Sequence, residues 1–388
     1  MGANVTPHRG EDFTVISSES AFAALGSAWD GLVHEMPRPS PYLLHAWLRE
    51  WLRHYGSDSE LAIQVAFRDG ALVGAFPLVH KVRRGFRVAK FLGGEQSTLA
   101  DLLLSASAES RVGSSLLERA SSDHDFAELF GLAGDSRVAQ LAAPGQLHLF
   151  RRADAPVLEL TDDWDALYTA KVSAKRRSAS RRRLKQLQDR GPVEFSCARS
   201  QAELEIELEE AFELHALRWE GRQDGSGFAT PTGASFHRAA LGALADQGVI
   251  RHMTMRFAGR PIAFALGFVI NKSLYGYRMA FHPSFAHYSP GFQCLLEFVA
   301  AASREGVRRV ELLGGADSFK LELADHFAPL HLGLGLPGTP RGRAVVTART
   351  AARRLREHVK HSPAARRAYD ATEPLRARIA RPKNVLKA

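Results

Sequence analysis

A Ser-Pro-Gly triplet at residues 289–291 is the first place in this sequence where residue type and spacing suggest chemistry. Ser289 suits the position before a helix, Pro290 suits an early helical position, and the turn exposes backbone N–H groups. Exposed N–H groups at a helix N-terminus favour an anion, and phosphate is the commonest one. The triplet therefore predicts a phosphate-binding helix terminus.

The segments around this triplet predict the elements that position it. Three apolar stretches rich in Val, Ile, Phe and Tyr occupy residues 249–281 and are separated by short turns, which indicates an antiparallel meander. Residues 292–304 carry apolar side chains at helical spacing, and Gly306 suits the end of that helix. Residues 307–313 then predict a further strand.

Three meandering strands, a helix that can receive an anion and one more strand form an order that resembles the GNAT acyltransferase superfamily. Within it, the chain resembles the CelD-like group of bacterial acetyltransferases associated with cellulose and envelope polysaccharide synthesis. The resemblance rests on the triplet at 289–291, the segment 311–320 (ELLGGADSFK), residues 214–219 (LHALRW) and the basic run that begins at Ser173. It covers residues 160–325 well.

This resemblance implies an acyl-CoA donor, most simply acetyl-CoA, an amine acceptor that attacks the thioester directly, and no metal. The strand at 275–281 would offer its main chain to the pantetheine arm, and the amides of residues 289–292 would hold the pyrophosphate. The implied donor-binding residues are Met279, Ala280, Phe281, Ser289, Pro290, Gly291 and Phe292.

Acyl transfer to an amine also needs a proton acceptor near the reacting carbonyl. The resemblance favours Glu311, Asp317 and Lys320, and His282 at the end of the third strand is a further candidate. Each has a structural alternative: Glu311 has arginine neighbours for an ion pair, His282 suits a capped turn, and Asp317 suits a helix cap.

The sequence departs from related enzymes where a Tyr commonly returns a proton to the CoA thiolate, because Phe319 stands there. Tyr275, Tyr277, Tyr288 or solvent would then take that role.

An internal similarity suggests that the architecture occurs twice. Residues 67–74 and 257–264 share an aromatic residue, a tight turn and a short apolar strand. We therefore predict a mixed α/β fold with two tandem GNAT-like domains, the second of which carries the acyl-CoA site.

The predicted division places an N-terminal GNAT-like domain at residues 1–150. This domain lacks the triplet, so we expect it to be non-catalytic and to form one wall of the acceptor site. A linker is expected at 151–156, and the acyltransferase domain at 156–336. A basic tail follows at 337–388, helical or flexible, whose few apolar residues argue against a packed core.

Charge is distributed unevenly along the chain. Residues 171–190 carry a net +8 and residues 336–388 a net +11, so the remainder is acidic. Basic segments seek phosphate on a cofactor, a lipid head group or a nucleic acid. The first segment is either a solvated helix face or a clamp on phosphates. The tail is either a solvated extension or a surface for an anionic membrane or an acidic partner.

Other sequence features predict a cytoplasmic protein, peripheral to the inner membrane at most. Cys197 and Cys294 lie far apart and make no metal-ligand spacing, and no signal peptide is visible. The longest apolar run, at 261–270, is shorter than the about 20 residues needed to cross a bilayer.

The leading hypothesis is an N-acyltransferase whose acceptor is a small molecule or glycan precursor, such as an amino sugar or an amino-acid-like group. One alternative is a Fem-like ligase that uses aminoacyl-tRNA, in which the basic helix would contact nucleic acid. Another is a non-enzymatic, membrane-docked scaffold for polysaccharide synthesis.

Overall fold

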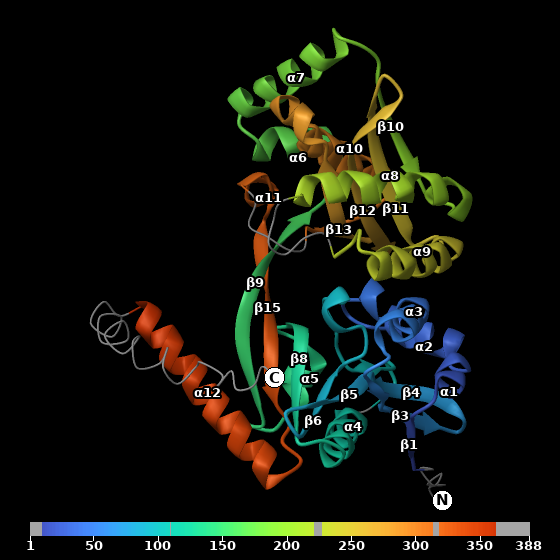
Figure 1. The fold of residues 1–388 in the computed structure, drawn as a ribbon, viewed down its shortest axis with the longest axis vertical. Coiled ribbons are helices and arrows are strands. Elements are labelled where there is room, and N and C mark those ends of the chain that lie inside the picture. The colour runs from blue at the N-terminus through green and yellow to red at the C-terminus, as the bar shows by residue number, and fades with distance from the viewer. Residues whose placement is uncertain (1–9, 109, 221–226, 313–317, 362–388) are drawn as a thin grey trace, which may run out of the picture.

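The computed structural model describes residues 10–108, 110–220, 227–312 and 318–361 (Figure 1). Within these ranges the strands form a small sheet and a large sheet. Helices pack on both, so the chain has the mixed α/β fold that the sequence predicts. No helix in the described ranges is long and apolar enough to cross a membrane.

The small sheet lies entirely in the first half of the chain. Its strands, in spatial order, are β1 (Asp12–Ile16), β3 (Ile63–Arg68), β4 (Ala71–Phe76) and β7 (Leu103–Leu104). The helices of this half are α1 (Glu19–Ala23), α2 (Gly26–His34), the 3-10 helix η1 (Pro41–Leu43), α3 (His45–Tyr55), the 3-10 helix η2 (Gly94–Gln96), α4 (Ser110–Ser122) and α5 (Arg137–Leu141). Helical spacing explains α3, in which Trp47, Leu48 and Trp51 are buried while Arg53 faces solvent.

The large sheet contains strands from both halves. Its strands, in spatial order, are β10 (Val193–Ala198), β11 (Ile250–Phe257), β12 (Arg260–Ile270), β13 (Ser273–Phe281), β14 (Arg309–Glu311), β9 (Leu147–Glu159), β15 (His326–Gly335), β8 (Phe126–Ala133), β6 (Phe86–Phe91), β5 (Leu78–Arg83) and β2 (Glu60–Leu61). The later helices are α6 (Trp164–Lys171), α7 (Ala174–Gln188), α8 (Gln201–Trp219), α9 (Pro231–Asp246), the 3-10 helix η3 (Pro283–Tyr288), α10 (Pro290–Arg304), α11 (Ser318–Leu323) and α12 (Pro340–His361).

The strands β11, β12 and β13 form the predicted antiparallel meander. Asn271 and Lys272 at the second turn have φ of 43° and 61°, a left-handed pair whose twist suits a two-residue hairpin. The helix α10 covers one face of the meander, and α8 and α9 cover the other. The following strand β14 is shorter than predicted, because it covers only 309–311 of residues 307–313.

The hairpin β3–β4 repeats the hairpin β11–β12 in detail. Residues 69–70 and residues 258–259 have the same left-handed turn, with φ of 51° and 79° in the first and 47° and 77° in the second. Both ladders also shift register near the turn, after Ala66 in the first hairpin and after Met255 in the second. A shared turn and a shared bulge support the predicted doubling of one architecture.

The two halves exchange strands (Figure 1). The strand β9 follows the first half but pairs with β14 of the second, and β15 follows the second half but pairs with β8 of the first. β9 and β15 also pair with each other along most of their length. The prediction of a linker at 151–156 is therefore wrong, because these residues lie inside β9, where Ala155 is fully buried.

The predicted helical tail is present as α12 over residues 340–361, and its first turns contact β8 and β15. Val346 is buried against Phe126 and Phe150. Arg341 pairs with Asp125, the residue just before β8. The sequence argues against a packed core in the tail, but the start of α12 packs on the large sheet, because the exchanged strand β15 places it there.

Candidate active site

The site begins where β13 and β14 separate. The two strands pair in parallel only from Ser273 to Tyr275, after which β14 ends and β13 continues to Phe281. β13 also bulges against β12, because Tyr277 is an extra residue in the ladder. Gly267 of β12 permits this bulge, since a Cβ there would lie 2.4 Å from the Tyr275 carbonyl oxygen. Among the described residues, no strand pairs with β13 on the β14 side beyond Tyr275.

A small pocket fills this separation. Gly276, Tyr277, Arg278 and Met279 of β13 line one side, and Lys320 of α11 lies on the other. Lys320 is a buried lysine in the lining of this pocket. The predicted Asp317, three residues earlier, lies outside the described residues.

The N-terminus of α10 opens into a second pocket, of about 440 Å³. Ser289 precedes the helix with a left-handed backbone (φ 53°), and Pro290 is its first residue. Gly291 is needed for space, because a Cβ there would lie 3.0 Å from Cδ1 of Phe281. Met279 lines both pockets, so one pocket at the helix terminus lies next to the other at Lys320.

Most of the predicted donor-binding residues meet at this second pocket. Met279, Phe281, Ser289, Gly291 and Phe292 line it. Ala280 and Pro290 are buried and line neither pocket.

The basic helix α7 covers the second pocket. Arg183 Nη1 donates a hydrogen bond of 2.9 Å to Ser289 Oγ, and the Arg176 guanidinium lies 5.5 Å from the centre of the Phe292 ring. Gln293 of α10 donates to both the carbonyl and the hydroxyl oxygen of Ser180, which fastens the two helices together. Arg183 therefore adds positive charge at a helix terminus that already favours an anion, whereas Arg176 is also paired with Glu322 at 2.8 Å.

Glu311, the last residue of β14, forms buried ion pairs. Its side chain is fully buried, and its two carboxylate oxygens accept hydrogen bonds of 2.9 and 2.7 Å from the Arg38 guanidinium of the first half. Arg309 Nε donates a third bond of 2.9 Å. A carboxylate engaged on both oxygens by two guanidiniums holds β14 against the first half and is poorly placed to accept a proton from an amine.

His282 also has a local structural contact. Its Nδ1 accepts a hydrogen bond from the backbone N–H of Ser284, which caps the 3-10 helix η3. It lines neither of the two pockets, whereas Phe281 beside it lines the second.

A cluster of aromatic rings and histidines joins the two halves beside the bulge. Trp47 of α3 packs edge-on against Phe236 of α9, with ring centroids 4.8 Å apart, and against Tyr277 at 5.4 Å. His237 Nδ1 lies 2.5 Å from the Gly233 carbonyl oxygen, and its Nε2 lies 2.6 Å from the Tyr277 hydroxyl. Because a carbonyl only accepts, Nδ1 carries the proton and Nε2 accepts from Tyr277.

Burial keeps this pair neutral. It lowers the pKa of His237 to about 3 and raises the pKa of Tyr277 to about 12. The pair therefore acts as a fixed hydrogen bond that orients Tyr277 at the pocket, and it does not exchange protons near neutral pH.

Arg278 is a partly buried cation at the same place. Its guanidinium lies 4.3 Å from the centre of the Tyr277 ring. Burial and, to a smaller extent, the Arg278 charge lower the pKa of His215 to about 4. Among the described residues no carboxylate pairs with Arg278, so none of them balances its charge at the first pocket.

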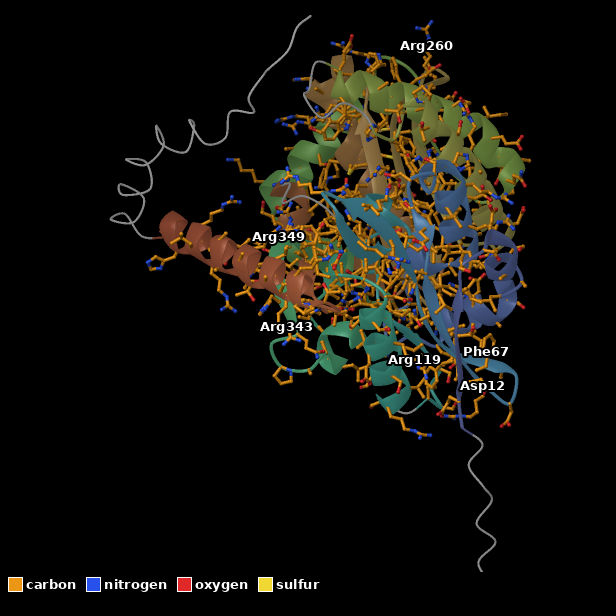
Figure 2. All side chains as sticks on the ribbon, turned by 60° about the horizontal axis from the view of Figure 1, so that its bottom comes forward. Asp12, Phe67, Arg119, Arg260, Arg343 and Arg349 are labelled. Atoms are coloured by element: carbon orange, nitrogen blue, oxygen red, sulfur yellow. The ribbon has the colours of Figure 1, made fainter. Side chains whose placement is uncertain are left out.

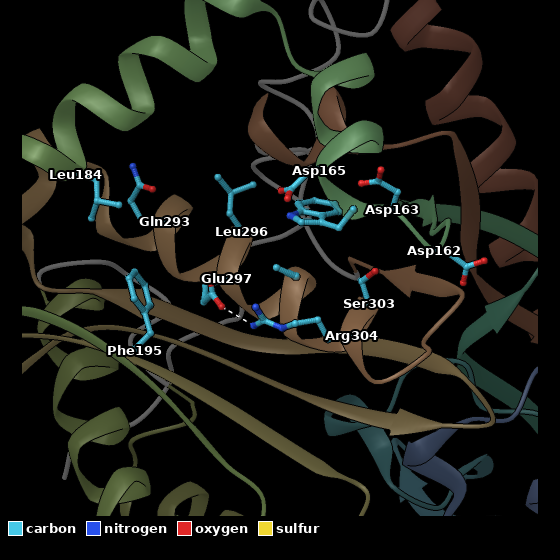
Figure 3. Close-up of a pocket in the computed structure, with 12 residues that line it drawn as sticks. Asp162, Asp163, Asp165, Leu184, Phe195, Gln293, Leu296, Glu297, Ser303 and Arg304 are labelled. Carbon is cyan, nitrogen blue, oxygen red and sulfur yellow. Dashed lines mark hydrogen bonds and ion pairs between the residues drawn. The ribbon is translucent and has the colours of Figure 1, made fainter.

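Another hollow, of about 470 Å³, lies on the outer side of α10 (Figure 3). Asp162, Asp163 and Asp165 lie along one end, and Glu297 pairs there with Arg304. Its acidic rim does not suit phosphate, so we place the candidate site at the two pockets joined by Met279. Among the described residues there is no group of three or more His, Cys, Asp or Glu side chains that could hold a metal ion.

Comparison with known proteins places this geometry in a class. Residues 174–321 match the family model described as an acetyltransferase (GNAT) domain. FemX shares the fold with a TM-score of 0.59 and 12% sequence identity, over 86% of this chain and all of its own. A conserved protein of unknown function from Bacteroides thetaiotaomicron VPI-5482 gives a TM-score of 0.53 and 14% identity, over 83% of this chain and all of its own. Comparison with the curated proteins gives no match.

The chain therefore contains a GNAT-type acetyltransferase domain, within a fold of two GNAT-like units. The protein is an acyltransferase, and a GNAT domain implies an acyl-CoA donor.

Several site residues escape a reading of the sequence. Arg38 and His237 are far from the predicted motif, and neither belongs to a motif of its own. Arg278 follows Tyr277 in a strand that is predicted from its apolar residues, and that pattern gives no role to a single arginine. Only the run that contains Arg176 and Arg183 gave a usable signal, because basic charge of that density predicts a phosphate contact.

Proposed function

We propose that the protein is an N-acyltransferase that moves an acetyl or other acyl group from acyl-CoA to an amine. The observation that carries this proposal is that the two pockets lie next to each other, which would allow a path from the cationic terminus of α10 to Lys320. Phosphates suit one end of the path, an extended arm suits the unpaired edge of β13, and a reacting carbonyl suits the other end.

In this proposal each part of the path has one role. Arg176, Arg183 and the first amides of α10 hold the phosphates of the donor. The donor supplies a thioester, which the amine attacks at the carbonyl carbon as the carbon–sulfur bond breaks. The Lys320 ammonium stabilises the negative charge that develops on the carbonyl oxygen. Asp317 is the proposed acceptor of the amine proton, because Glu311 and His282 are engaged elsewhere.

The acceptor proposal rests on Arg278 and on the sequence resemblance to the CelD-like group. An unpaired guanidinium beside Tyr277 favours an acceptor that carries a carboxylate or a phosphate in addition to its amine. An amino sugar phosphate or an amino-acid-like precursor of an envelope polysaccharide has this chemistry. The basic tail supports a further part of the proposal, in which the enzyme works at an anionic membrane surface.

The acceptor proposal is tested with a panel of amines in the presence of acetyl-CoA. A colorimetric thiol assay measures the release of free CoA, and mass spectrometry identifies the acylated product. We expect N-acylation of amino sugars or amino acids that carry an anionic group, and little turnover of matched neutral amines. Preference for neutral amines would contradict the role given to Arg278, and O-acylated products would contradict N-transfer.

A Fem-like reaction with aminoacyl-tRNA is a second candidate. It is favoured by the fold shared with FemX and by the exposed cations on α7, among them Lys175, Arg181 and Arg182. An RNA donor would bind with a steep salt dependence, since each neutralised phosphate releases counterions. Transfer from charged tRNA but not from acetyl-CoA would establish this candidate in place of the first.

A further inference from the structure

The helix α12 and the β5–β6 turn enclose a cavity that the acyltransferase site does not use. The cavity has a volume of about 660 Å³, within the range of small-molecule pockets. It lies between strands of the first half and α12, which packs on β8 and then projects from the rest of the molecule (Figures 1 and 2).

The floor of this cavity is apolar. Phe86, Val88 and Phe126 rise from β6 and β8, and Val345 faces them from α12. The Phe86 and Phe126 rings pack edge-on with centroids 6.0 Å apart. Such a floor suits a hydrocarbon chain and offers little to a free phosphate or a sugar.

The rim of the same cavity is cationic. Arg83 and Arg84 stand on the β5–β6 turn, and Arg349 faces them from α12. Arg349 pairs with Glu128, the acidic residue of the lining, whereas no carboxylate among the described residues pairs with Arg83 or Arg84. The rim therefore keeps a net positive charge.

The surface of α12 continues this charge away from the cavity. The helix carries seven Lys or Arg and one acid, Glu357. Figure 2 shows Arg343 and Arg349 along it. Burial lowers the pKa of Arg353, and the neighbouring Arg349 and Arg152 guanidiniums lower it further, so cations are crowded here.

We propose that the cavity between α12 and the β5–β6 turn binds an anionic phospholipid at a membrane surface. The arginines Arg83, Arg84 and Arg349 contact the phosphate of the head group, and part of an acyl chain lies on the floor of Phe86, Phe126 and Val345. A basic helix beside an apolar pocket is the combination that anchors proteins to anionic bilayers.

Charge complementarity selects this occupant over the chain's own C-terminus. Residues 362–388 contain seven Lys or Arg and two acids, so they match the sign of the rim and would be repelled by it. The apolar floor likewise favours a lipid over a nucleic acid, whose backbone needs cations alone.

This inference deepens the membrane-surface part of the proposed function, but it does not depend on acyl transfer. Co-sedimentation with vesicles tests it on the full chain. We expect binding to phosphatidylcholine vesicles that contain phosphatidylglycerol and not to phosphatidylcholine alone. Because each arginine near an anionic surface contributes on the order of fivefold, the double variant Arg83→Glu, Arg84→Glu should lose at least about tenfold in partitioning.

Matched controls separate a defined pocket from general charge attraction. The double variant Arg260→Glu, Lys272→Glu makes the same charge change on two exposed hairpin turns of the second half (Figure 2 labels Arg260) and should bind almost as wild type. For the floor, Phe86→Ala should weaken binding, whereas Phe13→Ala should not. Phe86 and Phe13 are both partly buried strand residues. The Arg341 guanidinium lies over the Phe86 ring, and the Arg119 guanidinium lies over the Phe13 ring.

Equal losses in both double variants would overturn the pocket and leave general charge attraction. Competition by inorganic phosphate, together with no effect of Phe86→Ala, would make the cavity a phosphate site. Displacement of vesicles by RNA that also requires Arg83 and Arg84 would make it a nucleic-acid site. Titration of the Arg83→Glu, Arg84→Glu variant with acetyl-CoA keeps this result separate from the donor site, because that affinity should not change.

Discussion

The hydrogen bond from Tyr277 to His237 fixes the side chain at the bulge of β13. Tyr277 lines the pocket at the end of the proposed donor path. His237 of α9 accepts the hydrogen bond from the Tyr277 hydroxyl. Because both groups stay neutral near pH 7, the bond contributes position rather than proton transfer.

Removing either partner should destabilise the fold, since it leaves a buried polar group unsatisfied. We expect Tyr277→Phe and His237→Ala each to lower the free energy of unfolding by about 1–3 kcal/mol. The double variant should lose less than the sum, because the orphaned partner is gone. Urea unfolding measures this, with Tyr55→Phe as a control at a partly buried tyrosine of the same region. Strictly additive losses would show that the bond is energetically unimportant.

Arg278 gives a prediction about specificity. A charged hydrogen bond of about 1.5–3 kcal/mol corresponds to roughly 10–150-fold in kcat/KM. Arg278→Gln should therefore lower kcat/KM by that factor for anionic amines and leave neutral amines and acetyl-CoA binding unchanged. Steady-state kinetics on the amine panel checks this, and an equal loss for both kinds of amine would assign Arg278 to structure alone.

At the scale of elements, one ion pair ties the donor-binding strands to the first half of the chain. Arg38 follows α2 and meets Glu311 at the end of β14, and Tyr275 Oη donates to the Pro39 carbonyl oxygen beside it. The separation of β13 from β14 is therefore supported by a segment more than two hundred residues away in the sequence.

Breaking this ion pair should be costly, because it leaves Arg309 as the one described partner of the buried Glu311 carboxylate and frees its second oxygen. We expect Arg38→Met to lower the free energy of unfolding by about 1.5–3 kcal/mol. Adding Glu311→Gln should restore part of it and, in the folded fraction, should leave acyl transfer measurable. Thermal unfolding with activity per folded molecule tests both points. Complete loss of turnover in a stably folded double variant would return Glu311 to the catalytic candidates.

Sequence patterns predict the elements well where the signal is local. The meander, its turns and α10 follow from apolar alternation, from the left-handed turn residues and from Ser289, Pro290 and Gly306. The exchange of β9 and β15 is not predictable in this way. Apolar alternation indicates that a segment is extended, but it does not say which edge the strand will join.

The candidate site divides along the same line. The places of Ser289 and Gly291 at the start of α10 could be predicted from a compact motif, as could the basic helix α7, and the phosphate contact itself stays a prediction. Arg38, His237 and Arg278 could not, since each acquires its role from a partner brought near by the packing of the two halves.

At the scale of the whole molecule, buried histidines in both halves make stability depend on acid. Burial lowers the pKa of His80, His124 and His215 to about 4 and that of His237 to about 3, all from an ordinary 6.5. His80 and His124 lie in the first half, with rings 5.7 Å apart.

Because these folded-state pKa values lie below the unfolded value, the unfolded chain binds protons first as pH falls. Stability is therefore complete above pH 6.5 and is lost between pH 6.5 and about 4, by up to about 3 kcal/mol for each histidine at about 1.4 kcal/mol per pKa unit. Urea unfolding across this range should show the decline, and His124→Gln should make it shallower. A flat profile would mean that the histidines titrate as exposed groups.

We propose that the terminus of α10 and the helix α7 together bind acyl-CoA, and calorimetric titration with acetyl-CoA, with CoA and with a longer acyl-CoA tests this proposal. We expect saturable binding by the wild type and none by Gly291→Glu, which puts a negative charge and a bulky side chain beside Phe281. We also expect about tenfold or greater weakening by Arg183→Ala, from the lost charged contact, and little change by Arg182→Ala, one residue along the same helix. No binding of any CoA species by the folded protein, or equal weakening by the two arginine variants, would contradict it.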